Sequence, residues 1–132
     1  MRATSRDKFV DGDERKRLGS RGESVAEAYL TAKGYHILYR NFRMGRGEID
    51  LICHTGKDLV IVEVKSVRGH IYEDGIERLS VKQQRKLIKT TYMYLATRVP
   101  FQPDSVRFDV ILVDFSAYPA KVHHYQEAFW EQ

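Results

Sequence analysis

The sequence predicts an α/β protein in which a mixed central sheet is covered by helices on both sides. Two segments, 23–33 and 81–96, have apolar residues at helical spacing. Three others, 47–53, 59–65 and 106–115, are apolar and rich in the β-branched residues that strands favour. The last of these is almost continuously apolar, which indicates a strand that is buried on both faces.

The composition is that of a globular protein with a single domain. The chain has 132 residues, of which 42% are hydrophobic and 30% charged, and this is enough to bury a core. Residues 1–17 alternate in charge sign and contain few apolar side chains, so we expect a flexible arm or a frayed lead-in there. The domain is then expected to span residues 18–132. The basic residues of the arm are either solvated or in contact with phosphate.

Location and charge narrow the class of protein. No apolar run is long enough to span a membrane, and the N-terminal residues lack the apolar core of a signal peptide. The single cysteine, Cys53, excludes an intrachain disulfide and fits a reducing compartment. We therefore expect a cytoplasmic protein with no membrane partner. The net charge of +4 allows a polyanionic partner, but basic proteins that bind no nucleic acid are equally common.

The first predicted helix carries an acid in its first turn, Glu23. A carboxylate at that position stabilises the helix dipole, and on the residues alone this is the simpler explanation of Glu23. A strand is predicted next, over residues 35–42, followed by a basic turn that contains Arg43 and Arg46. These two arginines are expected either to contact phosphate or to neutralise nearby acids.

Segments 47–53 and 59–65 are predicted to form a hairpin, because the Gly and Asp between them are typical of a tight turn. A turn over residues 55–58 fixes every pair. Three apolar pairs share one face: Cys53–Val60, Leu51–Val62 and Ile49–Val64. The other face carries one apolar pair near the turn and two charged pairs beyond it: Ile52–Ile61, Asp50–Glu63 and Glu48–Lys65. A slip of one residue would mix charged and apolar side chains on both faces, so the pattern specifies the register.

The charged end of this hairpin has the chemistry of a hydrolytic site. Asp50 and Glu63 are expected to face each other with Cβ atoms about 5 Å apart, where they repel unless they are neutralised. A divalent cation removes the repulsion, and Mg²⁺ is usually held by one or two carboxylates. Lys65 would then position or deprotonate the attacking water, or stabilise charge on a phosphate.

The same residues allow a purely structural interpretation. Arg43 or Arg46 would neutralise the acids, and Glu48 would form a cross-strand ion pair with Lys65 that contributes only ~0.2–1 kcal/mol. The residues alone favour neither interpretation. Other kinds of site are less well supported, since the five histidines lack zinc-finger spacing and neither a glycine-rich phosphate loop nor a nucleophile elbow is present.

The second predicted helix, 81–96, follows a candidate cap at Ser80. One of its faces is basic and consists of Lys82, Arg85, Lys86 and Lys89. No acid lies three or four residues away to pair with them, which favours contact with a polyanion over a merely solvated face.

The rest of the chain is predicted more simply. Residues 66–79 are expected to form a loop over the open end of the sheet. Residues 122–125 are expected to form a short edge strand, and residues 127–130 a terminal turn that packs Phe129 and Trp130.

The arrangement of acids resembles the core of the PD-(D/E)xK nucleases, which include restriction endonucleases and archaeal Holliday-junction resolvases. The residues that carry the resemblance are Glu23 in the first helix, Asp50 on the next strand, and Glu63 and Lys65 in a Glu-x-Lys motif. The proline of that name is absent, because Ile49 precedes Asp50.

The match is closer to the bacterial YraN family of endonuclease-like proteins. Gly-Glu-Ile-Asp-Leu-Ile at 47–52 and Val-Glu-Val-Lys at 62–65 resemble its pattern, as do shorter motifs spread over residues 18–113. The resemblance implies the restriction-endonuclease-like fold, with three layers. It also maps Asp50, Glu63 and Lys65 onto metal and catalytic positions, and Glu23 onto the helix acid of the resolvases.

A nuclease dependent on Mg²⁺ or Mn²⁺ is the function that the resemblance implies, with Asp50, Glu63 and Glu23 as metal ligands. DNA is expected as the substrate rather than RNA, with branched or recombining structures as candidates. The residues expected to contact phosphates are Arg43, Arg46, Lys82, Arg85 and Lys86.

Two other functions remain open. The first is a non-catalytic nucleic-acid-binding module of the same fold, since a fold does not fix an activity. The second is a protein-interaction subunit, supported by the C-terminal aromatic residues Tyr118, Tyr125 and Trp130. Because the resolvases of this fold work as dimers, a homodimer is also compatible with the resemblance.

Overall fold

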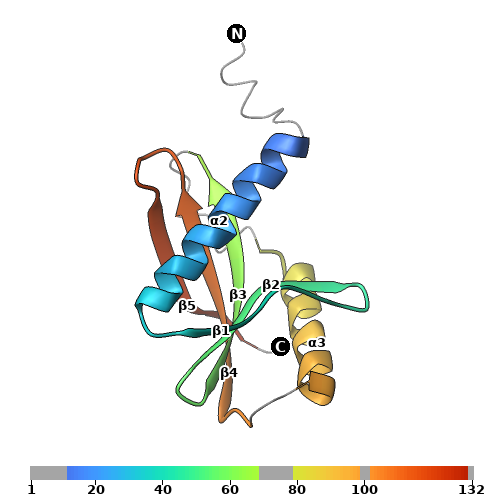
Figure 1. Cartoon of the computed structure of the whole chain (residues 1–132). Coiled ribbons are helices and arrows are strands. Elements are labelled where there is room, and N and C mark those ends of the chain that lie inside the picture. Colours follow the sequence, from blue (N-terminus) through green and yellow to red (C-terminus); the bar gives the residue numbers. More distant parts are fainter. Residues whose placement is uncertain (1–11, 69–78, 99–101, 131–132) are drawn as a thin grey trace.

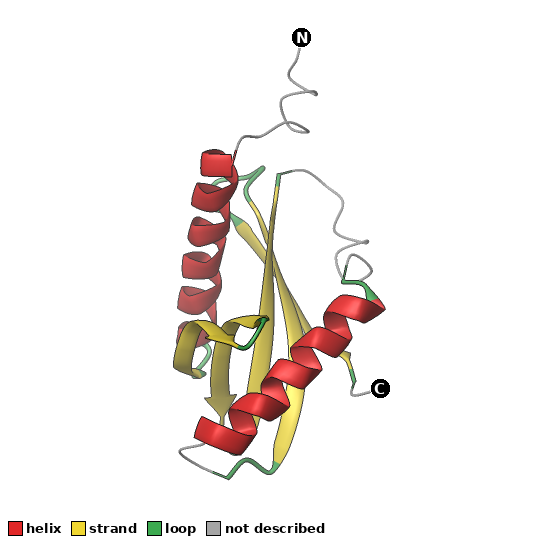
Figure 2. Ribbon diagram, turned by 90° about the vertical axis from the view of Figure 1, so that its right-hand side faces the viewer, coloured by secondary structure: helices red, strands yellow, loops and turns green. Residues whose placement is uncertain are grey.

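The structure is a computed structural model that describes residues 12–68, 79–98 and 102–130 of the chain (Figure 1). The elements in these residues are α2 (Gly12–Ala32), β1 (His36–Met44), β2 (Gly47–Thr55), β3 (Asp58–Val67), α3 (Val81–Arg98), β4 (Ser105–Asp114) and β5 (Lys121–Phe129). The strands form one sheet in the order β1-β2-β3-β4-β5, with α2 and α3 on opposite faces (Figure 2). This three-layer α/β arrangement confirms the predicted fold class.

The sheet is mixed because of one crossover. Strands β1, β2 and β3 form an antiparallel meander, and β5 pairs antiparallel to β4 at the other edge. Strands β3 and β4 are parallel, since the chain passes through α3 between them. As predicted, β4 is covered on both faces, and its residues 108–114 are all buried.

Each face of the sheet has its own core. The core beneath α3 includes Phe42, Ile49, Ile52, Leu59, Ile61, Leu87, Tyr94, Phe108, Val110 and Phe129. The core beneath α2 includes Ala26, Leu30, Tyr35, Leu51, Cys53, Val60, Val62, Ile111 and Val113. Burial raises the pKa of the Cys53 thiol to about 12, so this residue remains a protonated packing group.

Helix α2 is longer than predicted and begins at Gly12 rather than at Glu23. Residues 12–17, assigned above to the arm, are therefore helical, whereas residues 1–11 lie outside the described part of the chain. Gly22 lets the helix approach β3 closely, because a Cβ atom at this position would lie 1.9 Å from Ser66 Oγ. Ser66 in turn donates a hydrogen bond to the Leu18 carbonyl oxygen at 3.2 Å.

The predicted register of the central hairpin is confirmed over half of its length. Paired residues run from Thr55–Asp58 to Leu51–Val62, as the turn at residues 55–58 requires. The prediction for Ile49 is wrong, because this residue packs in the core beneath α3 rather than with Leu51 beneath α2. The change of face between residues 49 and 51 shows that β2 twists sharply at Asp50.

The C-terminal region is more regular than predicted. The edge strand expected at 122–125 extends over Lys121–Phe129 as β5, so no separate terminal turn forms. Phe129 is buried and stacks on Phe108 with ring centroids 5.0 Å apart, whereas the Trp130 side chain is 69% exposed and the prediction that it packs is wrong.

Two other predictions have mixed outcomes. The loop expected over 66–79 starts later, because Ser66 and Val67 belong to β3, and residues 69–78 lie outside the described residues. Ser80 caps α3 as predicted, since its hydroxyl accepts a hydrogen bond from the Gln83 N–H at 3.1 Å.

Neither of the described helices is long and apolar enough to cross a membrane.

Candidate functional site

The central hairpin opens at Asp50, where the pairing of β2 with β3 ends. Beyond the pair Leu51–Val62, the Asp50 side chain replaces a backbone carbonyl as the hydrogen-bond acceptor for β3. Its Oδ2 accepts a hydrogen bond from the Val64 N–H at 2.8 Å. The predicted continuation of the ladder through Asp50–Glu63 and Glu48–Lys65 is therefore wrong. The opening leaves the carboxylates of the two strands at the end of the sheet rather than across a regular ladder.

A left-handed residue, Asn41, lies beside the point where β2 separates from β3. It lies on β1 at the register position opposite Asp50, between Arg40 and Phe42, and its φ angle of 49° is left-handed. Asparagine tolerates this conformation better than most residues. Its side chain also forms a hydrogen bond with Glu23 of α2. Sequence reasoning missed Asn41, although an asparagine inside an otherwise apolar and aromatic strand was a signal that could have been followed.

Two carboxyl groups, those of Glu63 and Asp50, interact at this opening, and the pKa of each is raised. Burial and the negative charge of Asp50 raise the pKa of Glu63 from 4.5 to about 8. Burial also raises the pKa of Asp50, although the hydrogen bond from the Val64 N–H opposes the effect. A hydrogen bond joins the two carboxyl groups, and at neutral pH Glu63 carries the proton and donates it to Asp50.

Two further acids, Glu23 and Glu48, add negative charge near this pair. Burial first, and then the charges of Asp50 and Glu48, raise the pKa of Glu23, against the hydrogen bond from Asn41. Glu48 is half exposed, and its carboxylate lies 3.8 Å from the Arg43 guanidinium. The ion pair predicted between Glu48 and Lys65 is therefore wrong, because Glu48 pairs with Arg43 and Lys65 lies against Glu63.

Lys65 forms an ion pair with Glu63. Its Nζ lies 3.7 Å from Glu63 Oε2, with 28% of its side chain exposed. Its charge lowers the pKa of both Asp50 and Glu63, but the balance for each acid still points upward. One lysine therefore does not neutralise the cluster.

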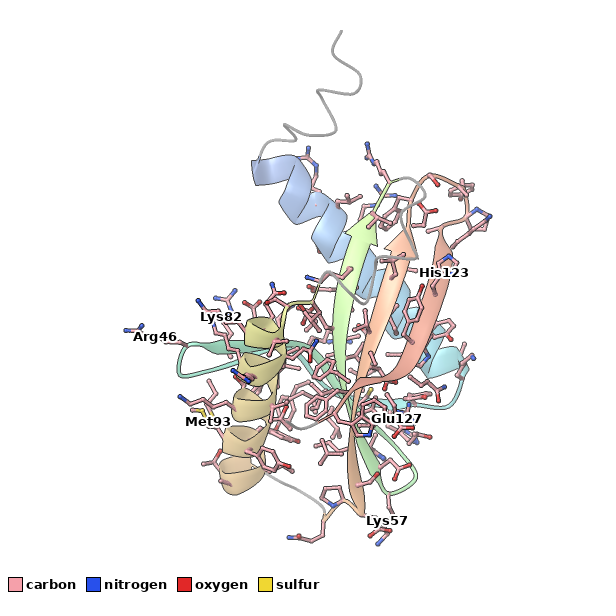
Figure 3. All side chains as sticks on the ribbon, turned by 180° about the vertical axis from the view of Figure 1, so that it is seen from behind. Arg46, Lys57, Lys82, Met93, His123 and Glu127 are labelled. Carbon is pink, nitrogen blue, oxygen red and sulfur yellow. The ribbon has the colours of Figure 1, made fainter. Side chains whose placement is uncertain are left out.

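The predicted phosphate contacts divide into two groups. Arg46 and Lys86 line an open hollow of about 320 Å³ together with Glu48, Glu63 and Gln83. Arg43 pairs with Glu48, as described above. Lys82 and Arg85 lie exposed on α3 outside the lining of the hollow. In Figure 3, Arg46 at the tip of the β1–β2 hairpin and Lys82 at the start of α3 project outward on the same side of the molecule.

A second hollow reaches the acids from the side of α2. It has a volume of about 360 Å³ and is lined in part by Glu23, Asn41 and Leu51. Glu27, which also lines it, is paired with Arg40, and the hydrogen bonds from this arginine lower the pKa of Glu27. Glu27 is thus compensated, in contrast to Glu23 one turn earlier.

The donor set fits a hard divalent cation in charge and chemistry. Asp50, Glu63 and Glu23 all offer carboxylate oxygens, and the raised pKa values show that the negative charges lack sufficient compensation. Within residues 12–68, 79–98 and 102–130, however, no three side chains of His, Cys, Asp or Glu are already arranged to hold a metal ion. A cation bound by these acids would have to take its remaining ligands from water, as Mg²⁺ usually does.

A second buried carboxylate, Asp109 on β4, lies in a very different environment. The Arg107 guanidinium donates two hydrogen bonds of 2.9 Å to it. His124 Nε2 lies 2.7 Å from Oδ2, and the Glu127 N–H donates to Oδ1 at 3.1 Å. Burial would raise the pKa of Asp109, but the hydrogen bonds from His124, Arg107 and Glu127 together hold it below its ordinary value.

Known proteins match the segment that contains the acid cluster. Residues 22–113 match the model of the uncharacterised protein family UPF0102. A UPF0102 protein of Symbiobacterium thermophilum is 44% identical over 75% of this chain and 83% of its own length. Relatives from Chlorobium limicola and Geobacter metallireducens are 39% and 41% identical over 87% and 86% of the chain, and over 93% of their own lengths in each case. This protein belongs to the uncharacterised family UPF0102, the YraN family.

Proposed function

We propose that this protein is a nuclease that depends on Mg²⁺ or Mn²⁺ and hydrolyses phosphodiester bonds in DNA. One observation carries the proposal: the pKa values of Asp50, Glu63 and Glu23 are all raised, and Glu63 lies beside Lys65 and lines a hollow with Arg46 and Lys86. Buried acids that lack compensation destabilise a fold, and they are typical of sites that bind a cation or move a proton.

Asp50 and Glu63 would hold the metal, and Glu23 would contribute from α2. A bound Mg²⁺ or Mn²⁺ would supply Lewis acidity at the phosphate and neutralise the charge that develops there. The Val64 N–H holds one oxygen of Asp50 in place by its 2.8 Å hydrogen bond. Glu63 must lose its proton before it can act as a ligand.

Lys65 would act on the water and the phosphate. Its ammonium group, 3.7 Å from Glu63, would orient the attacking water or stabilise charge on a phosphate oxygen. Arg46 and Lys86 would hold a flanking phosphate in the hollow that they share with Glu63. Arg43, Lys82 and Arg85 would contact phosphates farther along the strand.

The substrate is proposed to be DNA, with branched structures as the first candidates. The exposed basic side chains of α3 support a polyanionic partner, since this helix has no acid in its first turn to offset them. The preference for a branched structure rests on the resemblance to the resolvases alone.

Cleavage assays with purified protein test the proposal. Linear, single-stranded and four-way-junction DNA would be incubated with Mn²⁺, Mg²⁺ or EDTA. We expect metal-dependent cleavage of at least one of them by the wild type, and cleavage reduced to background by Asp50→Ala or Lys65→Ala. Glu27→Gln is the matched control, because Glu27 lies one turn from Glu23 but is neutralised by Arg40. Equal cleavage by wild type and Asp50→Ala would refute the proposed role of the acids.

A non-catalytic DNA-binding module is the second candidate. The absence of a pre-arranged set of three metal ligands among the described residues favours it. This function predicts salt-sensitive DNA binding that needs no metal and survives Asp50→Ala, with no cleavage of any substrate. A protein-interaction subunit would instead bind none of these DNAs.

A further inference from the structure

The turn between β4 and β5 forms a hollow with the middle of α2. The hollow has a volume of about 570 Å³ and is lined by Ser20, Arg21, Ser24, Val25 and residues 115–120. Tyr118 also lines the hollow, and 99% of its surface is exposed, compared with 69% for Trp130. An aromatic ring held this far from the core gains nothing from burial in this fold.

The turn that presents Tyr118 is well ordered by its own hydrogen bonds. Asp114 is fully buried, and its two carboxylate oxygens accept 2.9 Å hydrogen bonds from the N–H and the hydroxyl of Ser116. The Phe115 N–H donates to the Val67 carbonyl oxygen at 2.8 Å. The tyrosine is thus displayed on a fixed turn, and binding to it requires little ordering of the backbone.

The charge around the hollow is positive. The Arg21 guanidinium lies 4.7 Å from the centre of the Phe115 ring and stays exposed. Arg17, one turn earlier on α2, and Lys121, at the start of β5, are also exposed. In residues 17–22 and 115–121 there is no acidic side chain to oppose them. Cations around an exposed aromatic ring are the pattern that recognises a nucleotide, with phosphate on the cation and the base on the ring.

The hollow adjoins the one that Glu23 lines. Ser20 and Ser24, on successive turns of α2, line both this hollow and the one that contains Glu23 and Asn41. A strand that passes the acids on the α2 side would therefore reach Tyr118 by following the helix. The two serine hydroxyls would supply hydrogen bonds to its phosphates along the way.

We propose that Tyr118 and Arg21 form a binding site for an unpaired nucleotide of the DNA strand that enters the acid cluster, with the base stacked on Tyr118 and its phosphate against Arg21. This inference rests on the proposed function and deepens it, because it assigns a substrate class with unpaired nucleotides beside the cleavage point. A paired base cannot stack in this way, since its faces are covered by its neighbours in the duplex. The site thus favours forks, flaps and open junctions over continuous duplex.

Binding without catalysis tests the site. Fluorescence anisotropy in EDTA would compare a fork with two unpaired arms and a blunt duplex of the same length. We expect Tyr118→Ala to weaken binding of the fork about fivefold or more, and to leave binding of the duplex unchanged. Tyr118→Phe, which keeps the ring, should bind as the wild type does. Tyr92→Ala, which removes an exposed tyrosine from α3, is the matched control.

A spectroscopic variant reports on stacking directly. The chain has one tryptophan, Trp130, so the double substitution Trp130→Phe and Tyr118→Trp gives a single indole at the proposed site. The fork should quench its fluorescence, and the duplex should not.

The outcomes separate the two proposals. If wild type binds and cleaves DNA but Tyr118→Ala binds the fork equally well, or the indole is not quenched, the nucleotide site is overturned and the nuclease proposal stands. Such a result would assign the hollow to another class of partner, such as a peptide. If wild type binds no DNA at all, both proposals fail together.

Discussion

The acids that this sheet shields from solvent, Asp109 fully and Asp50 and Glu63 in part, occur in two contrasting environments. Asp109 accepts hydrogen bonds from Arg107, His124 and the Glu127 N–H, and its pKa is lowered in spite of complete burial. Asp50 and Glu63 have one backbone N–H and one lysine between them, and both pKa values are raised. The first environment stabilises the fold, whereas the second stores repulsion that a bound cation would relieve.

This contrast distinguishes a structural carboxylate from a candidate functional one. Burial is not the criterion, because the Asp109 side chain is less exposed than that of Glu63. The criterion is whether the fold itself supplies enough donors and positive charge. Among these three acids, Asp50 and Glu63 are the ones whose pKa values are raised.

The largest difference in stability is expected between two variants that each remove one carboxylate charge, Asp109→Asn and Asp50→Asn. Asp109→Asn should lower the free energy of unfolding by about 3–5 kcal/mol, because Arg107 is left buried without its counter-charge. Asp50→Asn should leave the stability of metal-free protein at pH 8 unchanged or raise it, since it removes repulsion from Glu63. Urea denaturation of both variants makes the measurement. Equal losses at the two positions would break the contrast.

The next effect is a dependence of stability on pH in metal-free protein. Folded Glu63 keeps a proton up to about pH 8, whereas the unfolded chain releases it near pH 4.5. The free energy of unfolding should therefore fall, on the order of 2–4 kcal/mol, as the pH rises from 4.5 to 8. Thermal denaturation at several pH values checks this, and Glu63→Gln should flatten the profile.

Asp109 should show the opposite sign. Because its folded pKa lies below the ordinary value of 3.8, its contribution is present above that pH and is lost as the pH falls further. A wild-type profile that rises steadily from pH 4.5 to pH 8 would contradict the assignment of the proton to Glu63.

A smaller effect is expected where the hairpin rests on α3. A Cβ atom at Gly47 would lie 1.8 Å from Thr90 Oγ1 and 2.8 Å from Thr90 Cβ. Gly47→Ala should therefore cost about 1–3 kcal/mol and shift the segment that carries Glu48. Gly19→Ala is the matched control, because nothing lies within 4 Å of its Cβ and the helix should gain about 0.4–1 kcal/mol. Equilibrium denaturation distinguishes the two, and equal stabilities would show that the hairpin does not pack closely on α3.

The smallest effect is expected for the exposed ion pair between Arg43 and Glu48. Their charged atoms are 3.8 Å apart, and 76% of the arginine side chain is exposed. Arg43→Ala should change stability by less than ~1 kcal/mol, yet weaken DNA binding in a salt-dependent manner. Anisotropy titrations at two salt concentrations provide the measurement. A loss of stability as large as that of Asp109→Asn would show that the arginine serves the fold.

Much of the fold was predictable because the apolar pattern is strong. Alternation in 47–53 and 59–65 fixed the hairpin register, and the continuous apolar run of β4 indicated a strand buried on both faces. The N-terminal half of α2 was not predictable in this way. It packs through Gly22, whose contact with Ser66 leaves no apolar signal.

The candidate site was predictable in composition but not in geometry. Asp50, Glu63 and Lys65 were identified as an acid and lysine group, and the structure brings them together at one end of the sheet. The ladder ends and Ile49 changes face at the position opposite Asn41, a single left-handed residue. A rule of alternation cannot anticipate such a residue, because it assumes a regular strand.

Calorimetric titration of Mn²⁺ into the protein at pH 7.5 tests the central claim most directly. We expect wild type to bind Mn²⁺ with release of a proton, because Glu63 is protonated in the free protein and must ionise to act as a ligand. Titrations in buffers of different ionisation enthalpy detect that proton. Asp50→Asn should abolish binding, while Glu27→Gln should not affect it. Absence of binding to wild type, or equal binding by Asp50→Asn, would contradict the claim that these acids form a cation site.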